Sequence, residues 1–338
     1  MLPPDATAIS WITPGDPRIE ADCEPLLSAL SRCGLGNFGT NLGGELRLIR
    51  AFSTTIPLLV VEAGQEFSDV CSPISRYVDY PLEETRRWAR PWQLVLFKAG
   101  AALMRLGLMR LGLERVVYVN NWLLSTNPPL RLNQPQIEAL IHWLAGEFSD
   151  HAIVYRTVNP ELEPELTSDL LAAGCRLLTT RVTYVSDPRQ APFLRHSDVS
   201  KDLRLLQTSP YVLSDDKTSL SQEDLQRLRD LYQCLYIRKH CRYNCQFHAA
   251  YFALMLATPM FRPVPGSPER PPGCLQLVHE ERVLSDELLC RLRPGIAAAA
   301  GSVSDGLDAQ GAAGAAARVA CQSQRWSRVV QAPARRPA

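Results

Sequence analysis

The sequence has almost no net charge. Its 36 lysine and arginine residues balance 35 aspartate and glutamate residues, which leaves a formal charge of +1 at pH 7. A chain this balanced lacks the global electrostatic field that draws proteins to nucleic acid or to anionic membranes. We therefore expect neither DNA nor a membrane as a partner, while a local basic patch stays compatible with these totals.

The opening residues, MLPPDATAIS, lack the positively charged and apolar regions of a secretory leader. The ten cysteines are scattered along the chain and do not form the dense pattern of a disulfide framework. Together these absences predict a cytoplasmic protein with reduced thiols.

The chain also lacks an uninterrupted apolar run of membrane-spanning length. The most apolar stretch, residues 93–113, is broken by Lys98, Arg105 and Arg110. Because charges placed in this way are costly inside a bilayer, the stretch predicts a helix packed in the protein core.

Several catalytic and nucleotide-binding motifs are missing. The sequence contains no G-x-S-x-G turn, no Walker phosphate loop and no dinucleotide-binding fingerprint. A hydrolase of the Ser/His/Asp type therefore has no local support.

What the first part of the chain does contain is an alternation of strand and helix patterns. Segments 45–52 and 55–63 predict a β-hairpin, and segment 82–106 predicts a helix broken or kinked at Pro91. Further strands are expected at 115–127, 151–159 and 176–185, with helices at 134–148 and at 160–174, the latter closed by Gly174. This order predicts an α/β (α+β) domain over residues 20–190, built on a mixed sheet flanked by helices.

Residues 1–19 contain four prolines and a glycine, which predicts an irregular lead-in. After residue 190 the pattern becomes helical. Ser221 and Asp224 fit a capping box at the start of a helix over 221–240, whose apolar stripe consists of Leu225, Leu228, Leu231 and Leu235. A second helix is expected at 248–257, so residues 191–261 resemble the helical start of a second α/β domain.

Residues 262–338 lack what a folded sheet requires. They contain no aromatic residue before Trp326 and no lysine, and they include long alanine-rich runs. One interpretation is a disordered extension. The other is a frameshift, because permitted codons read one nucleotide later give strand-like and helix-like peptides over 290–306 and 322–338; the gene sequence around residues 260–262 tests it.

Two segments carry a family resemblance. FSDHAIVYRTVNPELEPELTSDLLAAGCRLLTTRVTYVSD (148–187) and LYIRKHCRYNCQFH (235–248) resemble GNAT-type proteins of the FemAB-like branch. In that branch the second segment has the form LYxxKYSxxNPxYT, and here His240, Cys241, Cys245 and His248 replace its Tyr, Ser, Pro and Thr. The resemblance covers roughly residues 116–261.

The resemblance implies two tandem GNAT-like folds that transfer an acyl group from acyl-CoA, or an aminoacyl group from aminoacyl-tRNA, to a small-molecule amine. With the second sheet lost after residue 261, such an enzyme would be impaired. The alternative is a non-catalytic interaction fragment or pseudoenzyme whose exposed helices require a partner.

The joint between the last two helices supplies one candidate site. Tyr236 and Tyr243 are expected to donate a proton to the leaving group. Arg238, Lys239, Arg242 and Asn244 are expected to bind substrate, the three cations through a carboxylate or phosphate. Alternatively, Tyr236 packs and the cations form a solvated helix end.

The ends of two predicted strands supply a second set. Asn120, Asn121 and Trp122 follow one strand, and Arg156 and Asn159 lie at the next, where they can line a substrate cleft between the halves of the sheet. Polar residues at strand ends are also ordinary turn formers, and that alternative stays open.

No metal is expected. His240, Cys241, Cys245 and His248 are zinc-ligand types, but no second CxxC or HxxxH pattern completes the set. The glycines of segment 105–112 do not have the spacing of the Q/RxxGxG/A pyrophosphate loop of GNAT folds, so that segment is assigned to the core helix.

Overall fold

A computed structural model describes residues 9–64, 67–180, 221–261, 277–279 and 282–284. All of them belong to one compact unit made of Met1–Thr180, Leu220–Pro265 and Leu277–Leu284. The other unit comprises Arg181–Ser219, Gly266–Gln276 and Ser285–Ala338, which lie outside the described residues. The predicted domain boundary between residues 190 and 191 lies there as well.

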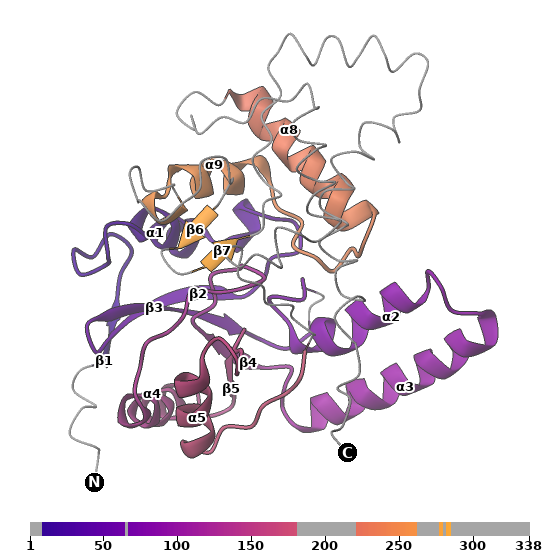
Figure 1. The fold of residues 1–338 in the computed structure, drawn as a ribbon, viewed down its shortest axis with the longest axis horizontal. Helices are drawn as coiled ribbons and strands as arrows, with labels where there is room; N and C mark the ends of the chain where they lie inside the picture. Colours follow the sequence, from indigo (N-terminus) through magenta and orange to yellow (C-terminus); the bar gives the residue numbers. More distant parts are fainter. Residues whose placement is uncertain (1–8, 65–66, 181–220, 262–276, 280–281, 285–338) are drawn as a thin grey trace, which may run out of the picture. The chain divides into compact units, whose positions relative to one another are not determined.

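The centre of the described unit is a five-stranded sheet in the order β1-β2-β3-β4-β5. Its strands are β1 (Ile9–Ile12), β2 (Glu45–Ala51), β3 (Thr54–Val61), β4 (Val116–Val119) and β5 (Ala152–Tyr155). All neighbours are antiparallel except β4 and β5, which run parallel (Figure 1). The prediction of a mixed α/β fold with a sheet flanked by helices is confirmed.

The helices lie between and after these strands. Those of the first 180 residues are α1 (Glu24–Cys33), η2 (Leu35–Asn37), η3 (Ser75–Asp79), α2 (Tyr80–Thr85), α3 (Pro91–Arg110), α4 (Gln134–Glu147) and α5 (Pro164–Ala172). The later ones are α8 (Gln222–Tyr232), η4 (Gln233–Arg238), α9 (Ala249–Ala257) and η5 (Pro259–Phe261).

Local signals in the sequence fix several element boundaries. The predicted hairpin is present as β2 and β3, and its turn residues Phe52 and Ser53 have positive φ angles of 48° and 69°, as two-residue hairpin turns require. Pro91 occupies the first turn of α3, where its missing N–H costs nothing. Ser221 accepts a hydrogen bond from the Asp224 N–H at 3.1 Å, which confirms the predicted capping box of α8.

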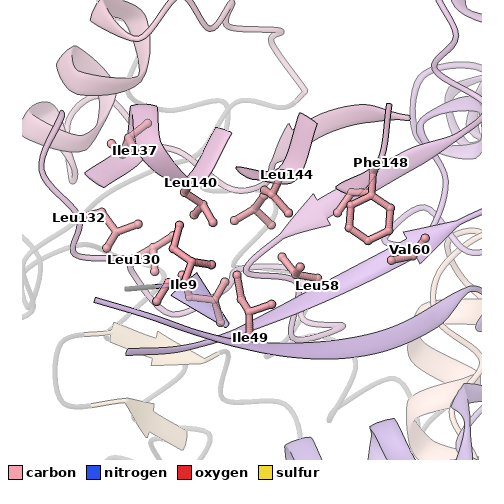
Figure 2. Packing of buried hydrophobic residues seen from close by; sticks show 14 of the residues in the cluster. Ile9, Ile49, Leu58, Val60, Leu130, Leu132, Ile137, Leu140, Leu144 and Phe148 are labelled. Carbon is pink, nitrogen blue, oxygen red and sulfur yellow. The ribbon is translucent and has the colours of Figure 1, made fainter. Parts of the chain in front are cut away.

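One face of the sheet packs against α4 and α5 (Figure 1). Ile137, Leu140 and Leu144 recur at three- and four-residue spacing along α4 and belong to one buried cluster with Ile49 and Leu58 of the sheet (Figure 2). All five side chains are fully buried. This cluster is the hydrophobic core between the sheet and α4.

The other face of the sheet is covered by α1, which contacts β2 and α9. Leu26, Leu27 and Leu30 of α1 are fully buried. Helix α8 in turn contacts α9. The helices expected to open a second domain therefore pack within the same compact unit as the five-stranded sheet.

Strand β1 corrects the expectation of an irregular lead-in for residues 9–12. Ile9 pairs with Ala51, and Ile12 pairs with Leu48, and both isoleucines are buried. The sequence did not predict this four-residue strand among the surrounding prolines and glycine. Its stability comes from pairing with β2, about forty residues away, which no local pattern shows. At the other end of the domain, residues 176–180 form no strand, and the rest of the strand expected at 176–185 lies outside the described residues.

Helix α3 corrects a second expectation. The sequence predicted a packed core helix, yet none of its residues is buried. Within the part of the chain that the structure describes, α3 is also the one helix whose length and composition would allow it to cross a membrane. The prediction was right about helix and wrong about burial, because apolar composition alone does not say what covers a helix.

Within the predicted aberrant tail, the structure describes two short antiparallel strands, β6 (Leu277–His279) and β7 (Arg282–Leu284). The remainder of residues 262–338, on which the disorder and frameshift expectations bear, lies outside the described residues.

Candidate functional site

The carboxyl ends of the parallel strands β4 and β5 carry the first candidate site. In open sheets with parallel strands, ligands bind in the crevice beyond these ends. Strand β4 ends at Val119, so the strand predicted to run to residue 127 gives way to a polar loop. Asn120, Leu123 and Thr157 in the two loops have positive φ angles of 57°, 61° and 60°. Such conformations are costly for leucine and threonine and concentrate at functional sites.

A hollow of about 10 Å³, enough for roughly one water molecule, lies between the two loops. Its polar lining comes from Asn120, Tyr155, Arg156, Thr157 and Glu163, and the rest from Val119, Pro128, Leu130, Val158 and Leu166. The structure therefore brings the predicted residues Asn120 and Arg156 to one place, although they are 36 positions apart.

Tyr155, one of the residues that line the hollow, has an unpartnered polar group. Its hydroxyl oxygen is buried and has no hydrogen-bond partner among the described residues. Burial also raises the pKa of Tyr155, so the hydroxyl stays protonated at neutral pH. A buried hydroxyl without a partner is uncommon and indicates a position where a ligand or water can bind.

Arg156 is oriented by two neighbours. Its Nη1 donates to Asn121 Oδ1 at 2.9 Å, and its guanidinium carbon lies 5.9 Å from the centre of the Tyr118 ring. Asn121 is fully buried, and its Nδ2 donates to the Val70 carbonyl at 2.9 Å. The cation is thus held at the strand ends, where it can meet a carboxylate or phosphate.

Asn120 and Trp122 make a closed local network. Trp122 Nε1 donates to Asn120 Oδ1 at 2.6 Å, and Asn120 Nδ2 donates to the Pro128 carbonyl at 2.6 Å. The Trp122 side chain is buried. It shapes the loop through Asn120 and is not among the residues that line the hollow.

Asn159 behaves as a turn former. Its Oδ1 accepts from the N–H groups of Glu161 and Leu162 at 2.9 and 3.3 Å, just before α5 begins. These contacts match the alternative interpretation of strand-end polar residues. Asn159 is likewise not among the residues that line the hollow.

An ion pair that the sequence analysis missed lies beside the joint. Asp69 Oδ2 lies 2.5 Å from Arg76 Nη1, with side-chain exposures of 8% and 21%. The Asp69 N–H donates to the Tyr243 carbonyl at 2.8 Å. No local sequence motif predicts this pair. Asp69 precedes η3, and the carbonyl that its N–H contacts belongs to Tyr243, 174 positions later.

Tyr243 is buried in the joint between η4 and α9. Arg242 Nη2 donates to its hydroxyl at 3.0 Å, and the Arg242 guanidinium lies 5.0 Å from the centre of its ring. Arg242 also pairs with Glu83, with Nε 2.9 Å from Oε2. The predicted anion-binding role of Arg242 therefore competes with a carboxylate already in place.

The remaining predicted residues of the joint contact neighbouring side chains and backbone carbonyls. Tyr236 stacks on Tyr232 at 4.7 Å, and its carbonyl accepts from Asn244 Nδ2 at 3.0 Å. Arg238 is exposed and donates to Cys234 Sγ at 3.8 Å, and the Lys239 carbonyl accepts from Arg87. The packing of Tyr236 agrees with the alternative interpretation of this helix end.

The cysteines near the joint are protonated structural thiols. Cys71 and Cys245 are fully or almost fully buried, and Cys245 Sγ donates to Ser68 Oγ at 3.7 Å. Burial raises the pKa of both thiols and raises that of Cys241 to about 12. Since the thiolate is the nucleophile, none of the three is activated for catalysis at neutral pH.

The four residues considered as zinc ligands do not point to a common centre. His248 contacts Thr40 Oγ1 through Nε2 at 3.1 Å, and burial lowers the pKa of His240. Among the described residues, no group of three or more histidine, cysteine, aspartate or glutamate side chains is placed to hold a metal ion.

Of the four residues expected to bind substrate at the strand ends, Asn120 and Arg156 line the hollow, and Trp122 and Asn159 do not. Only Asn120 and Arg156 share one surface. Comparisons with protein-family models, with curated proteins and with solved structures gave no match for this chain.

Proposed function

We propose that this chain is a GNAT-type N-acyltransferase whose acyl donor binds at the carboxyl ends of β4 and β5. The observation that supports the proposal best is that Arg156, Asn120 and Tyr155, whose hydroxyl is unpartnered among the described residues, all line one hollow beside the parallel pair. The mixed sheet flanked by helices is compatible with the fold that the resemblance implies. The donor is an acyl-CoA or an aminoacyl-tRNA, and the acceptor is a small-molecule amine.

The reaction makes limited demands on the protein. The amine nitrogen attacks the carbonyl carbon of the donor, an amide bond forms, and the bond to sulfur or oxygen breaks. The amine loses a proton and the leaving group gains one. Arg156 would bind a phosphate or carboxylate of the donor, and the Tyr155 hydroxyl would donate to its carbonyl oxygen.

The hollow is too small for such a donor as it stands. Binding therefore requires the loops after β4 and β5 to open. The left-handed conformations of Leu123 and Thr157 make those loops the strained part of the region, so opening releases a local cost of order 1–3 kcal/mol per residue.

A non-catalytic role is the second candidate. Tyr236 and Tyr243, the expected proton donors, do not line the hollow, and Tyr243 is buried. If the chain binds a donor without turnover, these residues serve packing alone, and the protein is a pseudoenzyme or an interaction fragment.

Donor binding is measured by thermal unfolding with a series of acyl-CoA esters. Ligand at a hundred times its dissociation constant should raise the unfolding temperature by about 5–10 °C. Arg156→Met should abolish most of this rise, whereas Arg176→Met, at an exposed position outside the hollow, should retain it. No rise with any ester in the wild-type protein would contradict the proposal.

A further inference from the structure

The exposed side of α3 is the largest unexplained feature of the described unit. Leu94, Ala101, Arg105 and Leu108 are half-buried and recur at seven-, four- and three-residue spacing, so they face the body of the protein. On the opposite side, Trp92, Leu96 and Leu103 are 60%, 63% and 72% exposed. Val95, Met104, Leu106 and Met109 extend the same surface. An apolar face of this size marks an interaction site.

The charge around this face has one sign. Between residues 86 and 113 the chain has six arginine or lysine residues and no aspartate or glutamate. Arg105 pairs with Asp79, and Arg87 donates to the Lys239 carbonyl. Arg86, Arg90, Lys98 and Arg110 form no ion pair with any described residue. The nearly neutral whole chain therefore contains a strongly cationic local surface.

We propose that α3 and the preceding loop bind the surface of an anionic lipid bilayer, with the apolar side of α3 inserted between headgroups. Tryptophan, leucine and methionine on the inserted side, with cations in the preceding loop and at the last residue of the helix, suit contact with an anionic interface. Lys98 lies seven residues from Arg105, close to the inner side of the helix, so its ammonium group can reach lipid phosphates while the leucines insert. Trp88 and Trp92 mark the headgroup level at one end.

Charge favours an anionic bilayer over a second copy of the chain as the partner of α3. Two α3 faces brought together would oppose the four cations of one copy that are unpaired among the described residues with those of the other, whereas anionic headgroups neutralise them. A transmembrane orientation is also disfavoured, because it would break the Arg105–Asp79 pair and strip the inner side of α3 from α2 and η3, which it contacts. The inference does not depend on the proposed acyl transfer.

The test uses the full-length protein and flotation with vesicles of phosphatidylcholine, with or without phosphatidylglycerol. The wild type should float with the anionic vesicles and remain in solution with the neutral ones. The double variant Leu96→Gln/Leu103→Gln should bind at least about tenfold more weakly, because two exposed leucines no longer insert. The matched control Leu162→Gln/Leu171→Gln, at exposed leucines outside α3, should bind like the wild type.

Lys98→Gln/Arg110→Gln should weaken binding by about tenfold and reduce its dependence on salt. Three results would overturn the proposal. They are absence of flotation, equal flotation with neutral vesicles, and flotation unaffected by the α3 leucine changes. A dimer in ultracentrifugation that the same leucine changes dissociate, without vesicle binding, would assign α3 to a second copy instead.

Discussion

Replacement of Leu140 by alanine is expected to lower the free energy of unfolding by about 2–5 kcal/mol. Leu140 is fully buried in the cluster between α4 and the sheet, beside Ile49 and Leu58 (Figure 2). The shorter side chain leaves a cavity that neighbours on two rigid elements cannot fill. Urea unfolding followed by circular dichroism measures the change.

The matched control is Leu103→Ala, the same substitution in another helix. Leu103 is 72% exposed, so its removal should change the free energy of unfolding by less than about 0.5 kcal/mol. Equal destabilisation by the two changes would mean that α3 is covered in the folded protein, which would contradict both the exposed face of α3 and the proposed membrane contact.

Arg76→Met is expected to cost about 3–5 kcal/mol. The substitution leaves the Asp69 carboxylate, which is 8% exposed, without its cationic partner. Because the Asp69 N–H also holds the Tyr243 carbonyl, the loss should loosen the joint between η4 and α9. Chemical unfolding gives the free energy, and faster labelling of Cys245 reports the loosening.

The comparison variant is Arg115→Met. Arg115 pairs with Asp150 at 2.8 Å and with Glu62 at 3.6 Å, but all three side chains are largely exposed. Exposed pairs contribute about 0–1 kcal/mol, so this variant should unfold close to the wild type. If Arg76→Met were equally mild, the Asp69 pair would not stabilise the joint between η4 and α9.

The sequence predicted the elements whose signals are local. The β2–β3 hairpin, the break at Pro91, the capping box at Ser221 and the end of α5 near Gly174 each depend on a few adjacent residues. The structure confirms all four. Gly174 has a φ angle of 85°, the left-handed conformation that a residue after a helix end adopts.

The features that were missed depend on distant partners. Strand β1 exists because it pairs with β2, and the exposure of α3 depends on what packs against it. Neither property is encoded in a short window. Asp69 was missed for the same reason, since only the folded chain brings its N–H to the Tyr243 carbonyl.

The candidate site shows the same division. Arg156 and Asn120 could be selected because polar residues after two predicted strands meet when those strands are parallel neighbours. The unpartnered Tyr155 hydroxyl could not be predicted. In the sequence this tyrosine is indistinguishable from an ordinary core residue, and only the structure shows that its hydroxyl has no hydrogen-bond partner among the described residues. The patterns at 221–240 and 248–257 predicted helices, which the structure confirms as α8 with η4 and as α9, but the motif at 235–248 gave no information about which joint side chains are buried.

The central claim is that an acyl donor binds at the carboxyl ends of β4 and β5. Hydrogen exchange measured by mass spectrometry, with and without acetyl-CoA and longer acyl-CoA esters, tests it directly. The account predicts slower exchange in peptides covering residues 119–130 and 155–166, and loss of this protection in Arg156→Met. Unchanged exchange there, or protection confined to other segments, would contradict it.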